Sequence, residues 1–269
     1  MDNLNLKLLN KELNSDSQGS KYFRLGSYHM KCGDFITARN EMELALSYHK
    51  ESLPSTHPVL SEDLTILGTI YWNLYNIRFA HRYYFEALEL DKQNFSHKHQ
   101  KVIRNINNLG LINKTQGRFD QAIWLFDRAL ISSLYTNPDK SDFHSNLGLS
   151  LYEKELYTDA KKEMEKALLL DINSEKELKI ARDLMYLGYV QKNIESPEKI
   201  INMINKAVEI YEANNRSNMV AICYTYIGDV SEDKNTKKQH YEKAIKIFQQ
   251  LSDEYQLDIK AIKIRMKGL

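Results

Sequence analysis

The chain has 269 residues, with 37 Lys and Arg against 36 Asp and Glu, so its formal net charge is +1. This balance excludes a global field that would attract nucleic acid or an anionic membrane. An apolar run of about 18 residues, which a membrane span requires, does not occur. The N-terminal residues mix acid, amide and lysine with their leucines and so lack the apolar core of a secretory signal. No membrane association is predicted.

A Leu-Gly or Ile-Gly pair recurs six times along the chain, at intervals of 38 to 42 residues. The glycines of these pairs are Gly26, Gly68, Gly110, Gly148, Gly188 and Gly228. Self-similarity at such a period predicts stacked helical hairpins, in which each repeat contacts only its neighbours. Cys32 and Cys223 lie five repeats apart. They are therefore expected to be free thiols in a reducing compartment, and the cytoplasm is the predicted location.

The first elements in chain order are a short leading helix and the first repeat. Residues 1–18 are predicted to be an N-terminal capping segment, in which residues 4–13 cover the open end of the array. Tyr22, Leu25 and Gly26 then share one stripe of a helix that should pack on its partner. Gly33 is placed to end this helix in a left-handed conformation, and Asp34 to cap the next one.

The same pattern continues over residues 19–250, which are predicted to hold all six repeats. Gly117 repeats the role of Gly33, and Pro197 lies in the turn of repeat five. Pro54, Pro58 and Pro138 fall between repeats, where a helix must stop. Repeat six is shorter, and its polar turn over residues 231–240 is expected to be irregular and mobile. Residues 251–269 are predicted to be a C-terminal capping helix.

The joint occurrence of Leu-Gly, Gly-Asp-Phe or Gly-Arg-Phe, and Ala-x3-aromatic resembles the tetratricopeptide repeat. Residues 52–76 look like kinesin-light-chain-type repeats, and residues 145–168 look like the repeat domain of Gram-positive peptide-pheromone receptors. The resemblance implies an all-α fold, a right-handed α-solenoid of about six helix-turn-helix repeats with terminal capping helices. It also implies a concave groove, since both kinds of relative bind peptides there. The abundance of Lys, Asn, Ile and Tyr would suit a bacterial source.

The resemblance places a set of side chains on the groove-facing side of the first helix of each repeat. They are Trp72 and Asn73 in repeat two, Arg104, Asn107 and Asn108 in repeat three, Ser145, Asn146 and Tyr152 in repeat four, Arg182, Tyr186 and Tyr189 in repeat five, and Tyr226 in repeat six. A carboxamide can pair with both polar groups of a peptide unit, and aromatic rings can bury the side chains of a peptide. The alternative is that the asparagines are merely solvated helix residues of an Asn-rich chain.

A groove that recognises a C-terminal carboxylate would need paired cations. Arg182 meets this requirement, but Tyr186 stands where the second cation belongs. A ligand with a C-terminal carboxylate is therefore disfavoured.

Nothing in the sequence indicates catalysis or a cofactor. Eight of the ten glycines occupy repeat positions, which leaves no cluster for a phosphate-binding loop. His97 and His99 have no further ligand nearby, so we expect a solvated turn there, and no metal site is predicted. No candidate nucleophile has a base near it in the sequence. The chain is not predicted to be an enzyme.

The sequence thus predicts a module that holds a protein or peptide segment in its groove, as an adaptor or a sensor. An alternative is the repeat domain of a bacterial regulator that responds to a signalling peptide and lacks its effector domain, because only about 18 residues precede the first repeat. A second alternative is an RNA-binding solenoid, prompted by the basic cluster over residues 97–104. That cluster lacks interleaved aromatic residues, so RNA is disfavoured. The identity of the partner and a homodimeric state stay open.

Overall fold

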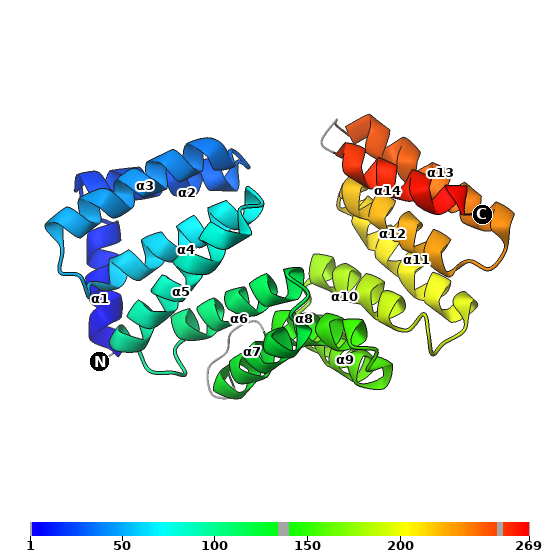
Figure 1. Ribbon diagram of the computed structural model, residues 1–269, viewed down its shortest axis with the longest axis horizontal. Coiled ribbons are helices and arrows are strands. Elements are labelled where there is room, and N and C mark those ends of the chain that lie inside the picture. Colours follow the sequence, from blue (N-terminus) through cyan, green and yellow to red (C-terminus); the bar gives the residue numbers. More distant parts are fainter. Residues whose placement is uncertain (1, 134–139, 252–254, 269) are drawn as a thin grey trace. The chain divides into compact units, whose positions relative to one another are not determined.

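The computed structural model describes residues 2–133, 140–251 and 255–268, and in these ranges the chain forms fourteen helices and no strand (Figure 1). The chain divides into two compact units, with the boundary between residues 139 and 140. None of the described helices is long and apolar enough to cross a membrane. The all-α prediction is confirmed.

The first unit is built from three helical hairpins and the leading helix. Its helices are α1 (Asp2–Leu13), α2 (Gln18–Lys31), α3 (Phe35–Ser52), α4 (Pro58–Asn73), α5 (Ile77–Asn94), α6 (Gln100–Thr115) and α7 (Phe119–Ser132). Consecutive helices pair as α2 with α3, α4 with α5 and α6 with α7. Each hairpin then packs on the next through the α3–α4 and α5–α6 contacts, and α1 lies against α4 and α2.

The second unit repeats this arrangement. Its helices are α8 (Lys140–Glu153), α9 (Tyr157–Asn173), α10 (Glu177–Val190), α11 (Pro197–Ala213), α12 (Ser217–Val230), α13 (Lys234–Leu251) and α14 (Gln256–Lys267). The hairpins are α8 with α9, α10 with α11 and α12 with α13, and α14 packs on α13. The first helices of successive repeats also meet directly, as α8 and α10 do.

The repeated glycine lets the two helices of each hairpin approach closely. A Cβ added at Gly110 would lie 2.5 Å from the ring of Phe126, and one at Gly26 would lie 2.6 Å from Met42. The other four glycines meet Tyr84, Met164, Ile204 and Tyr241 in the same way. In all six repeats the glycine faces a large residue of the partner helix.

The residue before the glycine is usually part of the core. It is buried in five repeats, as Leu67, Leu109, Leu147, Leu187 and Ile227. Leu25 in the first repeat is 47% exposed, so the prediction that it packs was wrong. The helices that pack on α2, namely α1, α3 and α4, leave this leucine uncovered.

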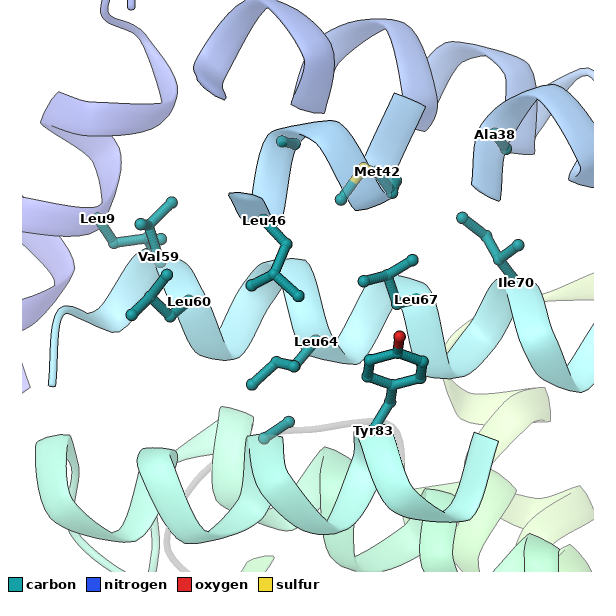
Figure 2. Close-up of a cluster of buried hydrophobic side chains, with 12 residues drawn as sticks. Leu9, Ala38, Met42, Leu46, Val59, Leu60, Leu64, Leu67, Ile70 and Tyr83 are labelled. Atoms are coloured by element: carbon teal, nitrogen blue, oxygen red, sulfur yellow. The ribbon is translucent and has the colours of Figure 1, made fainter. Parts of the chain in front are cut away.

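Leu9 of α1 joins the core of the first unit. It lies 4% exposed in a cluster with Leu46 of α3 and with Leu60 and Leu64 of α4 (Figure 2). Tyr83 of α5 closes the other side of this cluster. The core therefore runs through the hairpins rather than sitting at one centre, as expected for stacked repeats.

The turns within four of the six hairpins share one backbone conformation. Gly33 and Gly117 have φ of 82° and 71°, as predicted. Tyr75 and Glu155 take the same left-handed conformation at the equivalent positions, with φ of 57° and 62°. The Asp34 carboxylate accepts the Thr37 amide at 3.1 Å, which confirms the predicted cap.

Prolines begin two of the helices. Pro58 stands in the first turn of α4 and Pro197 in the first turn of α11. Pro138, also predicted to interrupt a helix, lies outside the described residues.

The turn of repeat six is shorter than the sequence suggests. Helix α13 begins at Lys234, so most of residues 231–240 are helical and the expectation of an irregular turn was wrong. The Asp233 carboxylate accepts the Thr236 amide at 2.7 Å and so caps the start of α13. This local cap outweighs the polarity of the segment.

Candidate functional site

Three of the predicted groove residues form a continuous row in the second unit. The ring centroids of Tyr152 and Tyr189 lie 4.8 Å apart, and those of Tyr189 and Tyr226 lie 5.0 Å apart. The three tyrosines come from α8, α10 and α12, so the row crosses three consecutive repeats. We call these three residues the tyrosine row. Such tilted ring pairs are favourable packing arrangements for aromatic side chains.

The tyrosine row is partly buried. Tyr152 is 7% exposed, whereas Tyr189 and Tyr226 are half-buried. Burial raises the pKa of each of the three phenols above its usual value. The hydroxyls therefore stay protonated at neutral pH and can each donate and accept a hydrogen bond.

A lysine sits over the exposed edge of the row. The Lys192 ammonium lies 5.4 Å from the ring centroid of Tyr152 and 4.9 Å from that of Tyr189. Both distances are within the range of a cation–π interaction. The row thus combines aromatic faces with a positive charge.

Arg182, the predicted groove cation, lies among three carboxylates. Its guanidinium is 2.5 Å from Asp142, 2.9 Å from Asp183 and 3.5 Å from Asp171. Asp183 and Asp171 are fully buried or nearly so. These carboxylates neutralise Arg182, so it stabilises the stacking of repeats and does not present an unpaired charge to a ligand.

The other predicted residues of the second unit differ in their surroundings. The Ser145 hydroxyl is buried and donates to Asp183 at 2.8 Å, so it belongs to the Arg182 cluster. Asn146 is half-buried on the same helix. Tyr186 is half-buried and packs with the core around Met185 and Cys223. Of this group, Asn146 and Tyr186 keep some accessible surface near the row.

The predicted residues of the first unit fall into two places. Arg104 forms an ion pair with Glu62 at 3.0 Å, and the Lys101 ammonium contacts the same carboxylate. Trp72 and Asn73 lie at the other end of α4, about 15 Å away along the helix axis. They are therefore not part of the ion-pair cluster. The Asn73 amide donates to the Thr69 carbonyl at 2.8 Å.

Asn107 and Asn108 are half-buried on α6, in the turn after Arg104. Their partial burial is consistent with the predicted groove position.

The charges around Glu62 determine its ionisation. Burial alone would raise its pKa, but Arg104 and Lys101 outweigh burial and hold the pKa at about 2. Glu62 is therefore ionised at neutral pH. Because it pairs with both Lys101 and Arg104, it offsets one of their two positive charges within the chain.

His99, near this cluster, is not in the solvated turn that the sequence suggested. Its ring stacks on Phe95 with a centroid distance of 4.2 Å, and its Nδ1 accepts the Lys101 amide at 3.3 Å. It therefore caps α6, while His97 is exposed. Within the described ranges, no three His, Cys, Asp or Glu side chains are grouped so that they could hold a metal ion.

The sequence analysis missed a cavity next to α1. It has a volume of about 390 Å³ and lies between α1, α4 and α6. Leu6, Leu9 and Leu13 line one side, and Glu62 and Arg104 line the other. No sequence signal could place α1 here, because its leucine pattern fits any apolar surface.

Solved structures of other proteins share this architecture. No family model matches the chain, and no curated protein matches it. Solved structures do match. The apo form of RapI has 16% identity and a TM-score of 0.72, with 93% of this chain and 99% of that chain covered. The chain has a tetratricopeptide-repeat fold.

Two further matches have the same architecture. A Rap protein complexed with Competence and Sporulation Factor shows 13% identity and a TM-score of 0.71, covering 98% of this chain and 78% of that chain. TPR-like repeats of a putative kinesin light chain from Podosopora anserina show 11% identity and a TM-score of 0.60, covering 73% of this chain and 95% of that chain. Both predicted resemblances are confirmed at the level of the fold.

Proposed function

We propose that this chain binds an extended peptide or protein segment on the first-helix surface of its second unit, as an adaptor or a sensor. The observation that supports this best is the tyrosine row, in which three consecutive repeats place rings 4.8 and 5.0 Å apart. Tyrosine supplies a large contact area at low cost in side-chain entropy, and its hydroxyl can pair with a peptide backbone.

The groups beside the row suit a peptide better than a small metabolite. The row runs across three helices, α8, α10 and α12, so it matches a ligand that spans several residues. Asn146 lies half-buried on α8, the helix that carries Tyr152. The neutralised Arg182 argues against a ligand held mainly by its C-terminal carboxylate.

A finer proposal is a bacterial, cytoplasmic regulator that responds to a signalling peptide. It is supported by the similarity to a Rap protein solved in complex with Competence and Sporulation Factor. At 13% identity this similarity concerns the fold. The peptide and the pathway of this chain are therefore not specified by it.

A selection experiment tests the binding surface. The immobilised chain is panned against a random library of about 12-residue peptides, since such a length spans three helices of a solenoid. The enriched peptides are synthesised and their affinities measured by fluorescence polarisation. We expect Tyr189→Ala to weaken binding by about 1 to 3 kcal/mol, as for a truncated aromatic contact residue.

Two further variants locate the surface and control for folding. Tyr189→Phe keeps the ring and should retain most of the affinity, which separates lost contacts from lost hydroxyl bonds. Trp124→Ala, at a 57% exposed position on α7 in the first unit, should change nothing. Unaltered affinity in Tyr189→Ala with weakened binding in Trp124→Ala would move the binding site to α7.

A further inference from the structure

A second feature of the same surface is a cavity of about 230 Å³ between α12, α13 and α14. Ile222 of α12, Phe248 of α13 and Ile262 of α14 form its apolar lining. An apolar cavity of about 150 Å³ can hold benzene. The cavity in this chain is therefore large enough for an aliphatic side chain.

The apolar lining of the cavity is held in place by helix packing. Phe248 and Ile262 are each 2% exposed and belong to the buried cluster that joins α13 and α14. The lining residue Thr225 donates its hydroxyl to the Ala221 carbonyl at 3.0 Å. An apolar side chain that contacts Ile222, Phe248 and Ile262 would be removed from water there, whereas a polar side chain at the same place would lose its hydrogen bonds to water.

The mouth of the cavity is charged. Asp258 and Arg265 line it, and both are exposed. The Arg265 guanidinium lies 3.6 Å from Asp229, which also accepts the Tyr241 hydroxyl at 2.7 Å. An apolar floor below a mouth of both charges fits a single apolar side chain carried on a polar backbone, and it does not fit a lipid or a wholly apolar surface.

Tyr226 connects this cavity to the tyrosine row. It lines the cavity, and its ring lies 5.0 Å from that of Tyr189. We propose that the cavity is an anchor pocket for one leucine, isoleucine or methionine side chain of the segment that lies along the row. This inference rests on the proposed function and adds the chemical class of residue that the ligand must contain.

The test uses the peptides selected on the wild-type chain. We expect them to share one aliphatic position, and replacing that residue with alanine should weaken binding about 10- to 100-fold, the loss of one buried aliphatic side chain. Ala261 is an exposed residue at the cavity, so Ala261→Trp should fill the pocket without entering the core. Ala261→Trp should weaken binding of the parent peptide to a similar extent and leave binding of the alanine-substituted peptide almost unchanged.

Two variants support this test. Lys263→Trp adds the same ring at an exposed position of α14 that does not line the cavity, and it should bind normally. Ala261→Leu fills less of the cavity, so it should give a smaller loss of affinity for the parent peptide. It takes the place of Ala261→Trp if the tryptophan variant disturbs α14. The pocket proposal would be overturned if Ala261→Trp bound the parent peptide normally. It would also be overturned if the selected peptides shared no aliphatic position. If Tyr189→Ala still weakens binding in that case, the proposed function stands without the pocket.

Discussion

Nδ1 of His49 lies 2.7 Å from Oδ2 of Asp63, and both side chains are fully buried where the first repeat stacks on the second. The next boundary has an equivalent pair, in which the Asn105 amide donates to Asp91 at 2.9 Å. Much of the remaining contact between stacked repeats is apolar, and apolar contacts tolerate shifts. Buried polar pairs that must stay matched therefore favour one register of stacking.

Removing one partner of the His49–Asp63 pair should show its contribution most clearly. His49→Ala leaves the buried Asp63 carboxyl without its partner, so we expect the free energy of unfolding to fall by about 3 to 5 kcal/mol. Urea unfolding followed by circular dichroism measures this. Replacing both His49 and Asp63 with leucine should be far less harmful, because no buried polar group is then left unpaired. A His49→Ala variant as stable as wild type would contradict this view of the boundary.

The close approach of α6 and α7 depends on Gly110. A Cβ at this position would lie 2.5 Å from the ring of Phe126, so Gly110→Ala should cost about 1 to 3 kcal/mol through overpacking. Phe126→Leu introduced together with it should recover part of the loss by making room. The midpoints of urea unfolding are compared for Gly110→Ala, Phe126→Leu and the double variant. Additive losses in the double variant would show that Phe126 is not the residue that Gly110 accommodates.

Neighbouring carboxyls on α4 should give opposite pH dependences. The pKa of Glu62 is about 2, below its usual 4.5, so its contribution of up to about 3 kcal/mol is complete above pH 4.5 and is lost as pH falls toward 2. Burial raises the pKa of Asp63 to about 6, so its contribution falls as pH rises from about 4 to 6.

The two contributions are separated by measuring the free energy of unfolding at several pH values. The measurement is made on the wild type, Glu62→Gln and Asp63→Asn. Glu62→Gln should remove part of the acid sensitivity below pH 4.5, and Asp63→Asn should leave that sensitivity in place. Identical pH profiles for wild type and Glu62→Gln would show that Arg104 and Lys101 do not hold Glu62 ionised.

The two thiols should differ in reactivity. Both cysteines are unpaired, as predicted, with Cys32 exposed and Cys223 buried. Burial also raises the pKa of Cys223 to about 12, so little thiolate forms at neutral pH. A chromogenic disulfide reagent should therefore label one thiol per folded chain rapidly and the second only in denaturant. Cys32→Ser should abolish the rapid reaction, and a rapid reaction that survives it would place Cys223 at the surface.

Local periodicity determined the fold of this protein. The glycine positions, the turns at Gly33 and Gly117 and the cap at Asp34 depend on contacts within one repeat, and each could be predicted from residues close in sequence. The same reasoning failed at Leu25, whose burial needs a preceding hairpin, and at residues 231–240, where a cap at Asp233 extends α13. The exposure of Leu25 depends on which helices stack on α2, whereas the start of α13 was missed because the polarity of the segment was given more weight than its local cap.

The candidate site depended on the tertiary structure to a greater degree. The resemblance to the tetratricopeptide repeat implied that Tyr152, Tyr189 and Tyr226 face the same side of their helices. Their contact, at centroid distances of 4.8 and 5.0 Å, follows from the lateral offset between stacked hairpins, which no single repeat encodes. For the same reason, only the folded chain shows that Arg182 is neutralised by Asp142, Asp171 and Asp183, since an arginine in a sequence reveals its charge but not its partners.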